Sequence, residues 1–194
     1  IEDIDAIAVT HRPGLVGSLI VGLTAAKGLA YLYNKPLVGI HHIEAHAYAA
    51  CYAGLQYGQS HISLVASGGH TSLLDVNRDG SIRLIGQTVD DAAGEAYDKV
   101  SKLLGFGYPG GPIIDKLANT CDMPSFKFPR PMMKSKNLNF SFSGLKTAVM
   151  YHHKTSPDSP PEEVAGAFQE AVVDVLVTKT LKAARLLDKD TVTV

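Results

Sequence analysis

Two histidines spaced four residues apart are the first candidates for a chemical role in this sequence. His42 and His46 would lie on one face of a helix, with imidazoles close enough to bind one metal ion. His41 would point about 100° away around that helix and is the weaker candidate. A third ligand, such as a carboxylate, would have to come from elsewhere. The alternative is a pair of polar surface residues, because this spacing alone is a weak motif.

The residue after the first histidine argues against a zinc-dependent protease. In that class of enzyme the catalytic glutamate directly follows the first histidine of the motif. Here Ile43 has that position, and Glu44 would lie on the opposite helix face. A metalloprotease therefore remains only a rival interpretation of the histidine pair.

A glycine pair at the end of an apolar strand pattern is a candidate phosphate-binding turn. Its residues are Val65, Ala66, Ser67, Gly68, Gly69, His70 and Thr71. Consecutive glycines let backbone N–H groups converge on an anion, and the hydroxyls of Ser67 and Thr71 could donate further hydrogen bonds. The alternative is a tight hairpin that needs glycine only for a positive φ angle.

A carboxylate downstream of this turn could bind part of a nucleotide-linked ligand. Asp98 falls in a helical pattern, where it could accept a hydrogen bond from a ribose hydroxyl or from an amino-acid ammonium group. The rival interpretation is a surface helix, capped by an aspartate, with an ion pair between Glu95 and Lys99. The turn at residues 108–112 enters another helix, with Asp115 one turn in. Backbone amides at that helix start could contact phosphate or sugar, or the turn is only a connector.

Alternating strand and helix patterns would position these candidates. Strands are predicted at residues 5–10, 37–40, 62–66, 72–76, 82–87 and 191–194. Helices are predicted at residues 15–30, 42–53, 93–104, 112–118, 143–154 and 160–187. The first two strands and the helix between them form a βαβ unit, which predicts parallel pairing. That first helix is apolar on nearly all sides, so we expect it to be buried.

The later helices carry apparent start signals. Ser143 is the expected cap of the helix at 143–154, and Ser159 with Glu162 would form a capping box for the last helix. The last helix would face the core with Val164, Phe168, Ala171, Val172 and Val175.

Composition gives the chain no global positive field that would attract nucleic acid, because the net charge is -1. One local basic segment either contacts nucleic acid or is a solvated loop. Its cations are Lys127, Arg130, Lys134 and Lys136, interleaved with Phe126, Phe128 and Phe140. The cysteines, Cys51 and Cys121, lack metal-binding or redox spacing, so we expect free thiols in a reducing compartment.

The order of elements predicts an α/β fold with two lobes, of the doubled ribonuclease-H-like type, with ligands between the lobes. We assign residues 1–59 to the remainder of the N-terminal lobe plus the metal-site helix. Residues 60–194 would form a C-terminal lobe with a helical insertion. Because strand patterns stand at both ends of the sequence, we expect an internal piece of a longer protein, incomplete at both ends.

Six segments, taken in order, resemble the TsaD family of tRNA threonylcarbamoyladenosine synthases, which has the actin-like ATPase (ASKHA) fold. The matching segments are residues 13–15, 42–46, 67–71, 94–99, 108–112 and 142–147. The likeness covers essentially the whole chain, and six motifs in order are far more specific than any one of them.

The resemblance implies transfer of a threonylcarbamoyl group from threonylcarbamoyl-adenylate to N6 of the adenosine 3′ of the anticodon. The tRNAs would be those that read codons beginning with A, and AMP would be released. His42 and His46 would hold one divalent ion, iron or alternatively zinc. The implied substrate contacts are Val65, Ala66, Ser67, Gly68, Gly69, Asp98, Gly111 and Asp115; no catalytic residue is identified.

The implied partners are tRNA, a pseudo-enzyme paralogue of the TsaB type and a small ATPase of the TsaE type, in the cytoplasm and without a membrane. The sequence departs from the family at Arg12, where a glycine is usual. The family's first phosphate loop, substrate-binding asparagine, adenosine loop and metal-binding aspartate have no match, so we expect this piece to be inactive alone.

Three rival functions remain. A non-catalytic paralogue could keep the fold as a scaffold of the same complex, although His42, His46 and Asp98 argue against loss of the site. A metalloprotease is the second rival. An actin-like sugar kinase or ATPase is the third, and the histidine pair has no evident use there.

Overall fold

A computed structural model describes the backbone of residues 1–194 and every side chain except that of Ala53. The chain divides into two compact units, Ile1–Tyr57 and Gly58–Val194. Both units combine strands with helices, so the predicted α/β class is confirmed. Among the described residues, no helix has both the length and the apolar character needed to cross a membrane.

The first unit is a βαβ motif that continues into the histidine-bearing helix. Its elements are β1 (Ile7–Arg12), α1 (Val16–Leu32), β2 (Leu37–His41), α2 (His42–Ala49) and the 3-10 helix η1 (Ala50–Ala53). β1 and β2 pair in parallel, as predicted, with Ile7 beside Leu37. β2 passes directly into α2, so the end of the strand fixes where the histidine helix begins.

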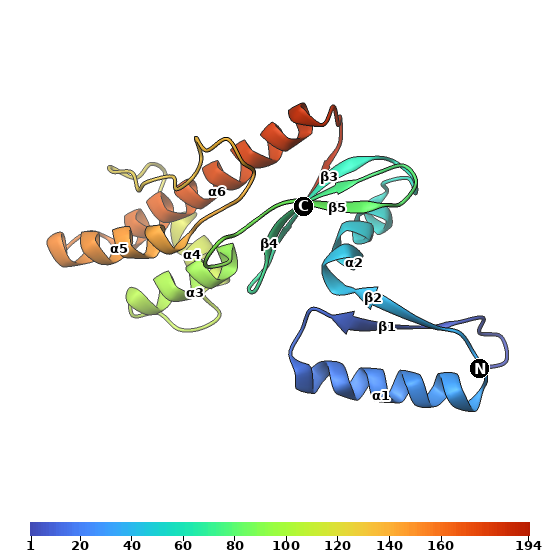
Figure 1. The fold of residues 1–194 in the computed structure, drawn as a ribbon. Coiled ribbons are helices and arrows are strands. Elements are labelled where there is room, and N and C mark those ends of the chain that lie inside the picture. The colour runs from blue at the N-terminus through green and yellow to red at the C-terminus, as the bar shows by residue number, and fades with distance from the viewer. The chain divides into compact units, whose positions relative to one another are not determined.

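α1 lies along one side of this two-stranded sheet (Figure 1). The prediction that this helix is buried is wrong, because Ala26 is the only buried residue that it has. Val16, Val21 and Leu32 keep 70%, 72% and 74% of their surface exposed. A sheet of two strands can cover only one face of a helix that is apolar on nearly all sides.

The second unit is built on a four-stranded mixed sheet in the order β5-β4-β3-β6. The strands are β3 (His61–Ala66), β4 (Thr71–Val76), β5 (Ile82–Gln87) and β6 (Val192–Thr193). β3, β4 and β5 pair antiparallel, and β6 joins β3 in parallel. The predicted hairpin around the glycine pair is confirmed, with Ala66 paired to Thr71 where the turn begins and ends.

Helices beside this sheet supply most of the core of the second unit (Figure 1). They are α3 (Ala93–Leu103), α4 (Gly110–Ala118), α5 (Ser143–Thr155) and α6 (Pro161–Leu186). The predicted core residues of α6, from Val164 to Val175, are all buried. Phe140 and Phe142, which lead into α5, are fully buried in the same core and anchor the start of that helix.

The helix starts are not capped by the residues that the sequence predicted. Ser143 is the first residue of α5 rather than its cap. Ser159 makes no capping bond to α6, because its hydroxyl lies 3.0 Å from Nε2 of His152. The cap position of α3 is Ala92, not an aspartate. Side chains that are distant in the sequence reach several of these helix starts instead.

Candidate functional site

The histidine pair lies on the exposed face of α2. The opposite face is fixed by Ile43 and Ala47, which are buried. The two imidazole rings meet edge to face, with centroids 4.5 Å apart and planes inclined by 66°. The Nε2 atoms of His42 and His46 converge to 3.2 Å. His41 stands apart, since it ends β2 and its Nδ1 atom is buried.

The separation of the two Nε2 atoms fits a shared metal ion. Two metal–nitrogen bonds of about 2.0–2.1 Å at a tetrahedral angle place the nitrogens about 3.3 Å apart. An N–H···N hydrogen bond between the rings would give a similar distance. The described residues contain no cluster of three or more His, Cys, Asp or Glu side chains able to hold an ion. The pair can therefore supply two ligands, and the remaining ligands must come from other groups.

The glycine turn between β3 and β4 is closed by Ser67. The Ser67 N–H donates to the His70 carbonyl over 2.8 Å, and the His70 N–H donates to the Ser67 hydroxyl oxygen over 3.2 Å. Gly68 and Gly69 are exposed, and neither has a positive φ angle. A Cβ atom added to either would meet no atom within 4 Å. The turn is therefore a tight hairpin, but the expectation that its glycines serve a positive φ angle is wrong.

Open backbone at Gly68 and Gly69 suits a ligand that approaches the main chain closely. Among the described residues, their N–H groups find no hydrogen-bond acceptor. Neither φ angle nor packing requires glycine here, so these N–H groups remain available to an anion.

Val65 and Thr71, at the two sides of this turn, point into the protein. Thr71 is 1% exposed, and its hydroxyl oxygen accepts a hydrogen bond of 2.8 Å from the N–H of Ala93. The prediction that Thr71 donates to a ligand is therefore wrong, because this side chain caps α3. Val65 is 7% exposed and keeps its side chain in the core, whereas Ala66 is exposed.

α3 begins directly against the glycine turn. The Gly94 N–H donates to the Ser67 carbonyl over 3.2 Å. A Cβ atom at Gly94 would lie 2.7 Å from that carbonyl oxygen and 2.8 Å from Cα of Gly68. Only glycine allows this contact. Asp98 lies one helical turn after Gly94, about 6 Å along the helix axis. The helix α3 therefore holds this carboxylate at a fixed distance from the exposed glycines.

Asp98 joins α3 to the start of α4. Its Oδ1 atom accepts a hydrogen bond of 2.7 Å from the N–H of Gly110. A Cβ atom at Gly110 would lie 2.6 Å from Cα of Asp98, so the two helices meet closely through this glycine. Within the described residues, Oδ2 of Asp98 accepts no hydrogen bond. Gly111 is different from Gly110, because a Cβ atom there would meet nothing within 4 Å.

Asp115 belongs to a hydrogen-bonded chain that the sequence did not reveal. The Gln169 amide donates to one Asp115 oxygen over 3.0 Å, and the Tyr97 hydroxyl donates to Oε1 of Gln169 over 3.3 Å. Burial, together with the negative charge of Asp115, raises the pKa of Tyr97 to about 12, so this hydroxyl stays protonated. No local pattern relates Tyr97 to Gln169, which lies 72 residues away on α6.

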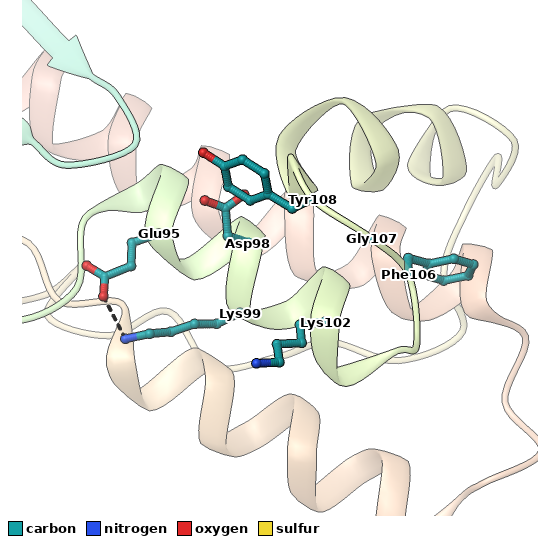
Figure 2. Close-up of a pocket in the computed structure, with 7 residues that line it drawn as sticks. All are labelled: Glu95, Asp98, Lys99, Lys102, Phe106, Gly107 and Tyr108. Atoms are coloured by element: carbon teal, nitrogen blue, oxygen red, sulfur yellow. Dashed lines mark ion pairs between the residues drawn. The ribbon is translucent and has the colours of Figure 1, made fainter.

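A pocket of about 370 Å³ opens beside Asp98 on the exposed face of α3. Figure 2 shows this pocket between α3 and the segment 106–108, with the Glu95–Lys99 ion pair at one end and Phe106 at the other. Lys99 pairs with Asp91 at 2.6 Å and with Glu95 at 2.9 Å, and these hydrogen bonds raise the pKa of Lys99. The surface ion pair expected for a plain solvated helix is present, but the same face also borders a concave site.

Asp90 is a second residue whose role the sequence did not reveal. It accepts hydrogen bonds from the N–H groups of Phe142 and Ser143 and from the hydroxyls of Ser141 and Ser143. Burial alone would raise the pKa of Asp90, but these hydrogen bonds outweigh burial and hold the pKa below 3.8. The N-terminus of α5 is therefore occupied by a carboxylate of this chain.

The predicted site residues fall into two groups. His42 and His46 meet each other in the first unit. The glycine turn, Asp98, Gly111 and Asp115 lie along α3 and α4 in the second unit. The second group offers exposed backbone N–H groups, a carboxylate with one free oxygen and a pocket, which together suit a phosphorylated, hydroxyl-bearing ligand.

Comparison with known proteins points to one family. The family model TsaD, described as tRNA N6-adenosine threonylcarbamoyltransferase, matches residues 1–194. A protein of that name from Thermotoga neapolitana is 54% identical over 186 residues, which cover 96% of this chain and 57% of the relative.

Two further relatives carry the same name. The protein from Thermosipho africanus is 52% identical over 194 residues, covering 99% of this chain and 59% of the relative. The protein from Syntrophotalea carbinolica is 52% identical over 188 residues, covering 94% of this chain and 54% of the relative. The chain thus spans somewhat more than half the length of these relatives.

Proposed function

This chain belongs to the TsaD family, as its motifs predicted, and we propose that the complete protein is a tRNA N6-adenosine threonylcarbamoyltransferase. It would transfer the threonylcarbamoyl group from threonylcarbamoyl-adenylate to N6 of the adenosine 3′ of the anticodon. The substrates would be tRNAs that read codons beginning with A, and AMP would leave. The observation that carries the proposal is the match of the family model over all 194 residues.

The family has the actin-like ATPase fold, and the two α/β units agree with parts of it. We propose that residues 1–59 are the remainder of the N-terminal lobe plus the metal-site helix. Residues 60–194 would form the C-terminal lobe, with α3, α4 and α5 as its helical insertion.

His42 and His46 are proposed as two ligands of one divalent metal ion, iron or alternatively zinc. The 3.2 Å separation of their Nε2 atoms supports this proposal. When bound, such an ion would supply Lewis acidity that polarises the carbamoyl group. Each imidazole would bind the ion through an unprotonated ring nitrogen, because a metal ligand must first lose its proton.

The second unit is proposed to hold the adenylate. The exposed N–H groups of Gly68 and Gly69 would donate to its phosphate, with Val65, Ala66 and Ser67 contributing the strand end behind them. Asp98 would accept a hydrogen bond from a ribose hydroxyl through the oxygen that Gly110 leaves free. Gly111 and Asp115 would contact the rest of the nucleotide. Much of the rate acceleration would then come from positioning the substrate for attack by the adenine amine.

We further propose that the protein acts in the cytoplasm with tRNA, a TsaB-type pseudo-enzyme paralogue and a TsaE-type small ATPase. A non-catalytic scaffold of the same complex is the alternative function. The convergent histidines and the free carboxylate oxygen of Asp98 favour the enzyme over the scaffold, because a scaffold needs neither.

A direct assay separates these functions. The complete protein is incubated with unmodified tRNA and threonylcarbamoyl-adenylate, and the nucleosides of the digested tRNA are analysed by mass spectrometry. We expect N6-threonylcarbamoyladenosine to form, together with one AMP for each modified tRNA. If the protein, with its partners supplied, binds both substrates but forms no modified nucleoside, the scaffold function replaces the transferase.

A further inference from the structure

Lys179 of α6 is a fully buried lysine without a carboxylate partner. Its side chain has 0% of its surface exposed. The ammonium donates to the Ser135 hydroxyl over 2.9 Å and to the Asn137 carbonyl over 3.0 Å, and both acceptors are neutral. Burial, reinforced by the nearby charge of Lys182, lowers the pKa of Lys179. The Lys179 ammonium therefore lies at a buried position where desolvation disfavours its charged form.

Lys182, one turn further along α6, binds the same segment. Its ammonium donates to the carbonyls of Ser135 and Lys136 over 2.8 Å and 2.9 Å. The two lysines together fix residues 135–137 through four acceptors. We call residues 131–138 the basic loop. It is an irregular segment, yet its backbone is held in place by cations from a helix.

The basic loop carries positive charge and has no acidic residues of its own. Lys134 and Lys136 are exposed, and within the described residues neither side chain has an ion-pair partner. Residues 131–138 contain no aspartate or glutamate, and neither does the facing stretch of α6 at residues 175–186. Lys134 and Lys136 thus form an exposed cationic surface on a chain whose net charge is -1, and the ammonium groups of Lys179 and Lys182 lie behind it, bound to the loop.

Arg130, which the sequence grouped with these lysines, does not contribute free charge. It pairs with Glu170 at 3.0 Å and with Asp174 at 2.8 Å, both on α6. Phe128 and Phe140 are buried and cannot stack on an external base. The basic surface is therefore smaller than the predicted patch and is centred on Lys134 and Lys136.

We propose that the basic loop, which Lys179 and Lys182 hold in place by hydrogen bonds, is a contact surface for the phosphate backbone of RNA. The inference rests on the proposed function, whose acceptor is a tRNA, and adds a place where this chain would hold it. Neutral donors such as glutamine could make the hydrogen bonds of Lys179 without the cost of desolvating a charge. An ammonium at this place instead adds positive charge behind the loop, which favours an anion on its outer side.

RNA fits this surface better than an acidic protein does. Protein interfaces are depleted in lysine and have apolar residues at their centre. The large hydrophobic side chains of the basic loop are Met132, Met133 and Leu138, and all three are half-buried. A charged surface without an apolar centre is expected for contacts with phosphates. Such contacts position a nucleic acid without reading its sequence.

The test measures tRNA binding by the complete protein with its partners, by fluorescence anisotropy over a salt series. The variant is Lys134→Ala with Lys136→Ala. The matched control is Lys116→Ala with Lys154→Ala, which removes two exposed lysines of α4 and α5. We expect the basic-loop variant to bind tRNA several-fold more weakly, with a slope of log affinity against log salt that is smaller by about 2. The control and the binding of threonylcarbamoyl-adenylate should not change.

The outcomes separate this inference from the function on which it rests. If the wild type modifies tRNA but the basic-loop variant keeps the wild-type affinity and salt slope, the RNA surface is overturned and the transferase stands. If the wild type binds no tRNA, the proposed function fails and the inference fails with it. Poly-glutamate peptide is the second probe. Loss of its binding with tRNA binding unchanged would assign the surface to an acidic protein and overturn the RNA proposal.

Discussion

At the scale of single residues, the candidate site separates groups that hold the fold from groups left free. Thr71 uses its hydroxyl to cap α3, and one oxygen of Asp98 holds α4. Gly94 is required by close packing against the glycine turn. Gly68 and Gly111 have no such reason, because a Cβ atom at either would meet open space. Residues that the fold does not require are the better candidates for ligand contact.

Alanine substitutions at two glycines should have opposite effects. Gly111→Ala should leave the free energy of unfolding unchanged or raise it by up to about 1 kcal/mol, because alanine favours a helix and no atom obstructs it. It should nevertheless weaken AMP binding, because the methyl group intrudes where the nucleotide would lie. Denaturant unfolding and calorimetric titration with AMP measure both effects.

Gly94→Ala is the comparison for this prediction. Its Cβ atom would lie 2.7 Å from the Ser67 carbonyl oxygen, so it should lower the free energy of unfolding. Wild-type AMP affinity in Gly111→Ala would contradict the placement of a ligand over that glycine.

At the scale of helices and strands, periodicity predicted the elements well but not what fixes their ends. The predicted strand at residues 82–87 and the helix start at Ser143 agree with β5 and α5. The caps were missed because local rules consider only the nearest residues. Thr71, Asp98 and Asp90 reach the starts of α3, α4 and α5 only after the chain has folded. The same limit hid Gln169, whose partner Asp115 is 54 residues away.

The cap on α5 makes a pH-dependent contribution to stability. The pKa of Asp90 is lower in the folded protein than its ordinary value of 3.8, so the folded state binds this proton less readily than the unfolded state. The stabilisation is therefore complete above the unfolded pKa and is lost as the pH falls through the folded pKa. Asp90→Ala should lower the free energy of unfolding at pH 7 by about 1 kcal/mol, with the difference from wild type shrinking below pH 4.

Asp79→Ala is the matched control for that experiment. Asp79 also has a lowered pKa, but its hydrogen bonds come from Ser81 and from its own backbone N–H, within the turn between β4 and β5. Urea unfolding followed by circular dichroism at several pH values measures both variants. An Asp90→Ala protein as stable as wild type at pH 7 would show that α5 does not depend on this carboxylate.

At the scale of the whole molecule, the two units differ in how much of their apolar surface they cover. The second unit buries a continuous core that includes Phe140, Phe142 and Phe168. In the first unit, α1 leaves most of its apolar residues exposed. Hydrophobic periodicity predicted the helix but not its burial, because burial depends on which surfaces pack against it. The family match, by contrast, covers residues 1–194 and therefore both units.

The link between the units should be the first site of proteolysis within these residues. Tyr57 is 83% exposed beside Gly58, outside helices and strands. Tyr31 and Tyr151 are also exposed, but they lie within α1 and α5, whose hydrogen bonds protect the backbone. We expect brief chymotrypsin treatment to cut after Tyr57, as read by mass spectrometry, and Tyr57→Thr to slow that cut. Earlier cuts within Gly58–Val194 would contradict this division.

Metal content of the complete protein tests the central claim most directly. Inductively coupled plasma mass spectrometry compares wild type, His46→Ala and Glu44→Ala, all purified without oxygen. Glu44→Ala is the control because this exposed side chain lies between the two histidines on the same helix. The account predicts about one divalent ion per chain in wild type and Glu44→Ala, and loss of both the ion and tRNA modification in His46→Ala. Unchanged metal content in His46→Ala would contradict it.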